Sequence, residues 1–257
     1  MFASYLFHQT KYFIAFAALF WYANEAKVCA PKENSTIRQS WIVETAAVVP
    51  SKKTPETNPC FAGVKPGKLT KKERAFILSI TDGATLEEKY RLLRLIYKAY
   101  LTLTKNTVLS ECFTAQFVLE SGYGSTITGR FNYGGIKEFD PAKPRTLCRT
   151  VEMNCATSEI NAYKARKHYY GRAYVGGSTV YYVSDYFKDF KSLRAYLRYK
   201  NALIKSGASY KANGCAGAET VGDYCECIVK AGYATDPNYG EKIQAVLEFW
   251  NNYSIKK

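Results

Sequence analysis

The sequence predicts an α+β fold that is mainly helical, with a small β-hairpin region between two groups of helices. Helical periodicity of apolar residues runs to about residue 121 and returns after about residue 190. Residues 131–186 instead hold glycine pairs, two prolines and β-favouring runs such as STVYYVSDYF, a pattern typical of short strands. Because helices and strands are segregated, we do not expect an alternating parallel sheet.

The N-terminal part carries two segments without globular character. Residues 1–26 contain an apolar run at 12–23, which is short for a membrane span and fits the core of a secretory signal. An uncleaved anchor that contacts the membrane and a buried helix are the alternatives. Residues 27–70 are polar and hold five of the eight prolines, which predicts a linker or an extended arm, the latter pinned to the main domain by Cys60. Residues 71–257 would form the main domain.

The main domain opens with two well-marked helices. The stretch TLEEKYRLLRLIYKAYLTLT places Thr85 and Glu88 at capping-box spacing before a helical run. A second helix is expected over about 106–120, with Gly122 as its stop. After the β region, helices are expected over 190–205, 220–231 and 239–253.

Composition limits the kinds of partner. The net charge is +14, which favours nucleic acid, a membrane surface or a bacterial cell wall. The basic residues are dispersed and no nucleic-acid-binding motif is present, so we do not expect nucleic acid as a partner. The 22 tyrosines combine a flat apolar ring with a polar tip, which suits sugar ligands as well as ordinary packing.

The eight cysteines indicate disulfides in an oxidising compartment. Cys148 and Cys155 would close a short loop, and Cys215 would pair with Cys225 or with Cys227. Zinc is the weaker interpretation, because the chain has two histidines and no cysteine pair with the usual two-residue spacing. We therefore expect no metal. Cys112 is expected to be a small buried apolar residue.

One acid stands out at the end of the second helix, in FTAQFVLESGYGS. Glu120 follows an apolar stretch and precedes a glycine turn. Burial and the negative end of a helix both disfavour a charged carboxylate, so such a group keeps a proton that it can donate. A solvated helix end is the alternative.

The residues around Glu120 resemble the glucosaminidase family of peptidoglycan hydrolases, which includes flagellar and autolysin glucosaminidases. That family carries Ala-Gln-x-x-Leu-Glu-Ser-Gly-x-Gly-x-Ser followed by Asn-x-Phe-Gly-Ile-Lys. The matching positions are Ala115, Gln116, Leu119, Glu120, Ser121, Gly122, Gly124, Ser125, Asn132, Gly135, Ile136 and Lys137. Gly134 stands where the family usually has Phe, and Tyr123 where it often has Trp. A second block, AGYATDPNYGEKI at 231–243, resembles the family's Gly-Tyr-Ala-Thr-Asp-Pro-x-Tyr segment, and the resemblance covers roughly 85–252.

The resemblance implies a lysozyme-like fold, with a helical lobe, a small β-hairpin lobe and a glycan cleft between them. Glu120 would be the general acid for the β-1,4 bond after N-acetylglucosamine. Glu152 would be the second acid, with Glu159 as the alternative, and a substrate-assisted route would need neither. Tyr233 would stabilise the transition state.

Further roles follow from the same comparison. Tyr123 and Tyr133 would face sugar rings, although packing explains them equally well. Asn132 would bind substrate or, with Ser125, fix the turn around Glu120. Asp236 is expected to cap the last helix. No cofactor is implied.

The implied function is a secreted or membrane-anchored enzyme that acts on the cell wall, and carriage by a phage virion is an alternative location. A lytic transglycosylase is the nearest alternative. A non-catalytic wall-binding or structural module is the alternative from another class.

Overall fold

A computed structural model of the 257-residue chain describes residues 58–153, 155–175, 177–234, 236 and 238–256. The apolar segment 1–26, Cys29 and most of the segment 27–70 lie outside the described residues. No helix in the described part of the chain is long and apolar enough to cross a membrane. Its helices are η1 (Pro59–Phe61), α2 (Lys71–Ser79), α3 (Leu86–Thr104), α4 (Thr107–Ser121), α5 (Thr157–Ala165), α6 (Leu193–Ser206), α7 (Ala208–Ala212), η2 (Cys215–Gly217), α8 (Val221–Lys230) and α9 (Tyr239–Ile255).

The expected helices are present, and the caps predicted at the start of α3 and at the end of α4 are formed. At the start of α3, the Thr85 hydroxyl accepts from the Glu88 amide at 3.2 Å, and Glu88 accepts from the Thr85 amide at 2.8 Å. This confirms the capping box. Helix α4 ends at Gly122, whose φ of 51° is left-handed, as the sequence predicts. Helix α2 was not expected; Thr70 and Glu73 form a capping box at its start.

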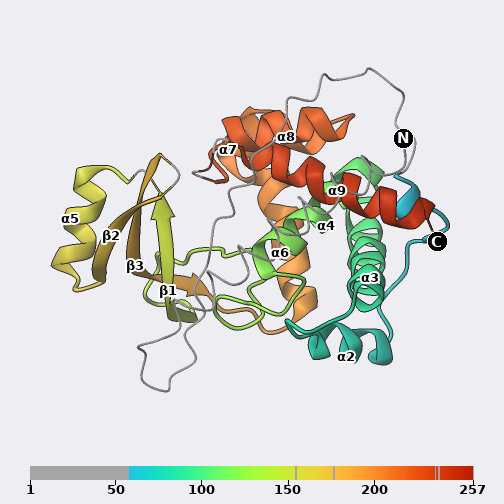
Figure 1. The fold of residues 1–257 in the computed structure, drawn as a ribbon, viewed down its shortest axis with the longest axis horizontal. Coiled ribbons are helices and arrows are strands. Elements are labelled where there is room, and N and C mark those ends of the chain that lie inside the picture. The colour runs from blue at the N-terminus through green and yellow to red at the C-terminus, as the bar shows by residue number, and fades with distance from the viewer. Residues whose placement is uncertain (1–57, 154, 176, 235, 237, 257) are drawn as a thin grey trace, which may run out of the picture. The chain divides into compact units, whose positions relative to one another are not determined.

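Helix α4 is the central helix of the core. Every residue from Val108 to Val118 is buried, and α3, α8 and α9 all contact α4 (Figure 1). Residues at the N-terminal end of the described chain join this core, since Phe61 of η1 stacks on Tyr97 with ring centroids 4.0 Å apart. Because α4 is buried on all sides over this range, its last turn is held in a fixed position. That turn carries Glu120.

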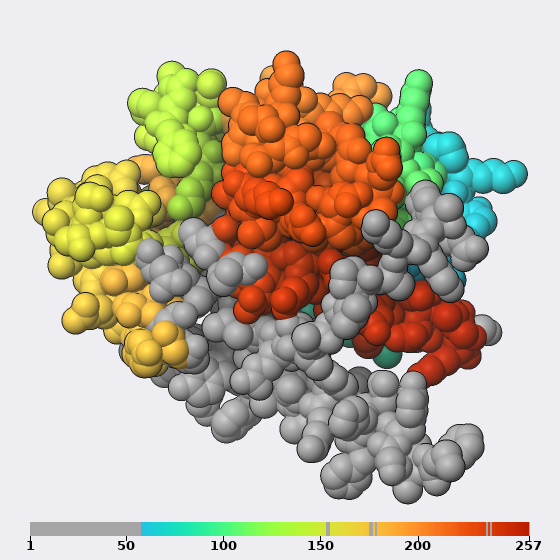
Figure 2. All heavy atoms as spheres, turned by 90° about the horizontal axis from the view of Figure 1, so that it is seen from above, coloured from blue at the N-terminus to red at the C-terminus, as the bar shows by residue number. Residues whose placement is uncertain are grey.

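The β region is larger than the predicted hairpin. Strands β1 (Arg145–Met153), β2 (Tyr169–Val175) and β3 (Ser178–Lys188) form an antiparallel sheet in the order β1-β3-β2. The chain between β1 and β2 forms α5, which packs Ile160 and Tyr163 against Val183 of β3. In Figure 2 the yellow segment that includes α5 lies to one side of the orange and red C-terminal helices. The prediction of a simple hairpin was incomplete, because α5 and the third strand were not expected.

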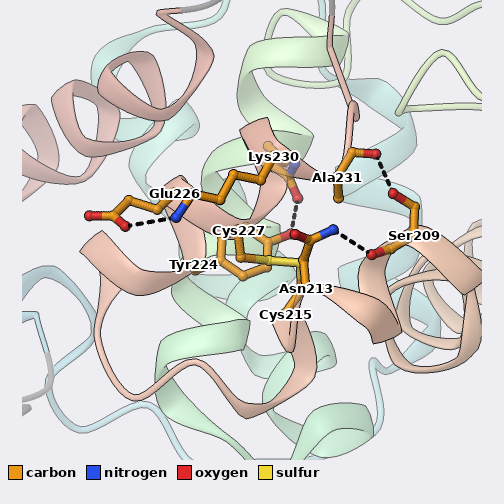
Figure 3. Close-up of a disulfide and its surroundings, with 9 residues drawn as sticks. Ser209, Asn213, Cys215, Tyr224, Glu226, Cys227, Lys230 and Ala231 are labelled. Atoms are coloured by element: carbon orange, nitrogen blue, oxygen red, sulfur yellow. Dashed lines mark hydrogen bonds and ion pairs between the residues drawn. A yellow bond between two sulfur atoms is a disulfide. The ribbon is translucent and has the colours of Figure 1, made fainter.

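One of the predicted disulfides forms, and another does not. Cys215 of η2 pairs with Cys227 of α8, with their Cα atoms 5.5 Å apart (Figure 3). Cys148 and Cys155 are free. Cys148 lies within the extended β1 strand, where each residue advances the chain by about 3.3 Å, so the strand itself separates the two thiols. The prediction of a Cys148–Cys155 bridge was therefore wrong. Cys112 is fully buried, as expected.

Candidate active site

Glu120 is the penultimate residue of α4, at the point where the chain leaves the core. Three successive residues, Gly122, Tyr123 and Gly124, have positive φ angles of 51°, 61° and 83°. The buried Ser121 hydroxyl donates to the Phe117 carbonyl at 2.5 Å and accepts from the Gly124 amide at 2.8 Å. This tight turn leaves Glu120 partly exposed at the edge of the core.

A chain of buried hydrogen bonds orients Glu120. The Tyr239 hydroxyl donates to Glu120 Oε1 at 2.7 Å, across 119 residues of sequence. Gln116 donates to the same hydroxyl at 3.3 Å, and Gln116 accepts from the Tyr224 hydroxyl at 2.7 Å. Burial, and then the charge of Glu120, raise the pKa of Tyr239 well above its ordinary value, so Tyr239 remains a donor.

Tyr233 lies beside this chain of hydrogen bonds. Its ring centroid is 5.4 Å from that of Tyr239. The ammonium of Lys200, which is fully buried on α6, sits 3.6 Å from the centroid of the Tyr233 ring. A desolvated cation over an aromatic face is strongly attracted to it. The structure thus brings Glu120 and Tyr233 into one neighbourhood with Tyr239 and Lys200.

The loop after the turn has a structural role at Asn132 and Tyr133. Asn132 is 1% exposed; it donates to the carbonyls of Ile136 and Lys188 and accepts from the Ile136 amide. Tyr133 is 3% exposed and stacks on Phe117 at 4.8 Å. These positions favour the turn-fixing role for Asn132 and the packing role for Tyr133.

Gly134 explains one departure from the family pattern. A Cβ at this position would lie 2.7 Å from the Tyr196 hydroxyl, which is closer than atoms pack. The Tyr196 ring also lies 5.6 Å from that of Tyr133. A buried tyrosine from α6 therefore takes the space that a larger residue at 134 would need.

Tyr123, the other departure, packs against α9. Its hydroxyl accepts from Trp250 Nε1 at 3.1 Å, and Lys89 lies 5.3 Å from its ring centroid. Burial raises the pKa of Tyr123 well above its ordinary range. Part of the side chain remains exposed, so contact with a ligand stays a prediction.

Glu152 belongs to a separate charged cluster on the sheet. Lys137, at the end of the loop, contacts Glu152 at 2.9 Å and Asp185 at 3.0 Å, and the Tyr163 hydroxyl donates to Asp185 at 2.9 Å. Burial lowers the pKa of Lys137, but the two carboxylates outweigh it and raise that pKa above its usual value. This cluster ties the loop to the face of the sheet that α5 covers.

Two other acids have structural contacts. Glu159 lies in the first turn of α5, not in a hairpin, and accepts from the Ala156 amide at 2.8 Å. Asp236 is buried, accepts from the Asn238 amide at 2.9 Å and pairs with Lys242 of α9. It thus secures the start of the last helix, although Asn238 occupies the cap position itself.

Three residues of the site had no role assigned from sequence: Gln116, Lys200 and Tyr239. Gln116 and Tyr239 belong to the two motif blocks, which was the available signal; only the fold reveals that the blocks meet. Nothing in the local sequence marks Lys200 as buried. Within the described residues, no cluster of three or more His, Cys, Asp or Glu is placed to hold a metal ion.

The fold is mainly helical with a small antiparallel sheet, and its candidate site presents a partly exposed carboxyl at the end of a central helix. The chain belongs to the glucosaminidase family: the family model described as mannosyl-glycoprotein endo-beta-N-acetylglucosaminidase matches residues 96–252. This confirms the resemblance seen in the motifs. No curated protein matches the sequence significantly.

Solved structures that are similar to part of this chain come from several bacteria. A peptidoglycan hydrolase mutant from Sphingomonas sp. A1 is 18% identical, with a TM-score of 0.47 over 64% of this chain and 97% of its own. The glycoside hydrolase domain of Salmonella typhimurium FlgJ is 22% identical, with a TM-score of 0.44 over 67% of this chain and 92% of its own. The catalytic domain of the autolysin Auto from Listeria monocytogenes is 18% identical, with a TM-score of 0.45 over 73% and 97%.

Proposed function

We propose that this protein is a peptidoglycan hydrolase that cleaves the β-1,4 bond after N-acetylglucosamine, with Glu120 as the general acid. The observation that carries the proposal is the 2.7 Å hydrogen bond from Tyr239 to Glu120. It joins the two sequence blocks typical of the family at a single carboxyl. This hydrogen bond fixes the orientation of the carboxyl, which a general acid needs in order to face a bound glycan.

The reaction begins with protonation of the leaving group. Tyr239 donates to Oε1 of Glu120, and in the proposed mechanism Oε2 is the oxygen that delivers the proton. Transfer of this proton to the bridging oxygen lets the glycosidic bond break and gives an oxocarbenium-like sugar. The buried Gln116 keeps the Tyr239 hydroxyl aimed at the carboxyl throughout.

The second group in the proposal is Glu152. A retaining or inverting glycosidase needs a second carboxylate to stabilise the sugar cation or to activate water. Glu152 stands on β1 in an ion pair with Lys137, so its position is coupled to the loop that follows Glu120. Tyr233 lies next to Tyr239, with ring centroids 5.4 Å apart, and is the residue that we propose stabilises the transition state.

The charge of the chain fits this substrate. A net charge of +14 favours association with a wall that carries acidic peptide stems and anionic polymers. We accordingly propose that the protein acts outside the cytoplasm, secreted or held at a membrane.

The test is to identify the new chain ends in digested walls. Purified peptidoglycan is incubated with the full chain, reduced with borohydride and analysed by mass spectrometry. We expect reduced N-acetylglucosamine at the new ends. Anhydro-muramic ends would identify a lytic transglycosylase instead, and binding without release of fragments would identify a non-catalytic module.

A further inference from the structure

The sheet has one face that α5 does not cover, which we call the outer face. Side chains alternate between faces along a strand, and residues paired across strands share a face. Val183 packs against α5, so its neighbours Tyr182 and Ser184 point the other way. Tyr182 pairs with Val151, Ser184 with Arg149, and Tyr186 with Leu147. The outer face therefore holds Arg145, Leu147, Arg149, Tyr182 and Tyr186. Tyr170, at an irregularity in β2, joins this face through the hydrogen bond between its hydroxyl and Ser184.

Large apolar groups on the outer face are exposed to solvent. Tyr170 is 51% exposed, Leu147 44% and Tyr182 41%. Exposed aromatic residues that gather on one face of a monomer mark an interaction site more often than chance placement. Such a face is also a flat platform, because strand side chains stand roughly perpendicular to the sheet.

Two arginines are stacked on tyrosines of this face. The Arg149 guanidinium lies 4.9 Å from the Tyr170 ring centroid, and the Tyr170 hydroxyl shares a hydrogen bond with Ser184 at 2.9 Å. The Arg145 guanidinium lies 3.8 Å from the Tyr186 ring centroid. Among the residues that the structure describes, neither arginine has a carboxylate partner within ion-pair distance. A guanidinium stacked in this way keeps its N–H edge available for a carboxylate, which it binds with two parallel hydrogen bonds.

We propose that the outer face is a second binding surface for peptidoglycan, which holds the polymer away from the bond that is cut. Its tyrosines receive sugar rings, and Arg145 and Arg149 receive the carboxylates of the stem peptides. The choice of occupant rests on the proposed function and on charge: the face is positive and aromatic, and the proposed substrate is an acidic glycan. Glu152 lies on the opposite face, in its ion pair with Lys137, so this surface is distinct from the second carboxyl.

A second contact on the same polymer has a kinetic use. A long insoluble substrate that is held at two places dissociates more slowly than one held at the reacting bond alone. A short soluble substrate reaches only the reacting bond. The outer face therefore affects solubilisation of whole walls and leaves turnover of short oligomers unchanged.

The test measures binding and turnover separately, in the full chain. Binding to insoluble peptidoglycan is measured by co-sedimentation with Glu120→Gln as the background, so that the polymer is not consumed. The variant Arg149→Ala/Tyr170→Ala should bind about tenfold more weakly, since it loses hydrogen bonds to a charged group and a stacking surface. The matched control is Arg166→Ala/Tyr174→Ala, which removes an arginine and an exposed tyrosine away from the outer face. This control should bind as the background protein does.

Turnover completes the test. With Glu120 intact, the outer-face variant should solubilise whole walls more slowly and cleave short soluble glycan oligomers at the parental rate. Unchanged wall binding would overturn the proposal. An equal loss of cleavage rate on short oligomers would also overturn it, because the face would then be part of the active site. A tenfold loss of binding to single-stranded DNA, with wall binding intact, would overturn it as well. Arg149→Gln alone, which keeps most of the side chain, replaces the double variant if that variant melts early.

The outcomes also separate this proposal from the proposed function. If the parental protein releases no fragments but binds walls through Arg149 and Tyr170, the surface stands and the enzymatic assignment fails. If fragments are released and the outer-face variant binds walls as strongly as the background protein, the enzymatic assignment stands and the outer-face proposal fails.

Discussion

Replacing Glu111 by Gln should make folding less sensitive to pH. Glu111 lies on α4, is 5% exposed and accepts a hydrogen bond from the Asn58 amide at 3.0 Å. Burial raises its pKa from 4.5 to about 7, because a charged carboxylate is poorly solvated there. The side chain of Gln is almost the same shape and still offers an oxygen to Asn58, but it carries no titrating proton.

The size and sign of the effect follow from this pKa. The folded protein holds the Glu111 proton more tightly than the unfolded chain does. The resulting stabilisation is complete below about pH 4.5 and is lost as the pH rises through about 7. A rise of this size corresponds to about 3 kcal/mol. Glu111→Gln removes this dependence, so its stability relative to the parent should increase by about that amount between pH 4.5 and pH 8.

Urea unfolding at a series of pH values measures this difference. Other titrating groups are common to both proteins and cancel in the comparison. The control is Glu226→Gln, because Glu226 is 75% exposed and pairs only loosely with Lys230 at 3.5 Å. A difference between Glu111→Gln and the parent that stays constant with pH would refute the reasoning.

Three further results are expected. Tyr239→Phe keeps the buried ring but removes the donor to the helix-end acid, so kcat should fall about 10- to 100-fold with little change in KM or melting temperature; an unchanged kcat would contradict the positioning role. Reduction of the Cys215–Cys227 bridge, which closes a separation of 12 residues, should lower unfolding free energy by about 3 kcal/mol, with no effect of reductant on the double serine variant. Gly134→Ala should lower stability by about 1–3 kcal/mol, and Tyr196→Phe should relieve part of that loss in a double-mutant cycle.

The helices that the sequence predicts correctly are those with local signals at both ends. Thr85 and Glu88 satisfy each other's backbone groups within one turn, so their spacing alone predicts where α3 begins. Gly122 ends α4 because a left-handed residue is needed there and glycine adopts it without strain. Such signals depend only on residues that are close in sequence, so they can be recognised without knowing the fold.

The parts that were missed depend on distant contacts. Helix α5 has a weak local pattern, and it is held by Ile160 and Tyr163 against a strand formed later in the chain. Tyr239 acquires a role only when α9 folds back onto the end of α4. The pairing of Cys215 with Cys227 rather than Cys225 follows from the orientation of α8, which turns Cys227 towards Cys215 and packs Cys225 close to Gly240 of α9.

Hydrolysis of purified walls by Glu120→Gln tests the central claim most directly. The substitution keeps the size of the side chain and an oxygen for Tyr239 to donate to, but removes the acidic proton. A positioned general acid contributes about 10²- to 10⁴-fold to the rate. We expect release of soluble fragments to fall by a factor in that range, while the melting temperature stays near that of the parent and the exposed control Glu219→Gln remains active. Hydrolysis by Glu120→Gln within a few-fold of the parental rate, in a folded protein, would contradict the assignment.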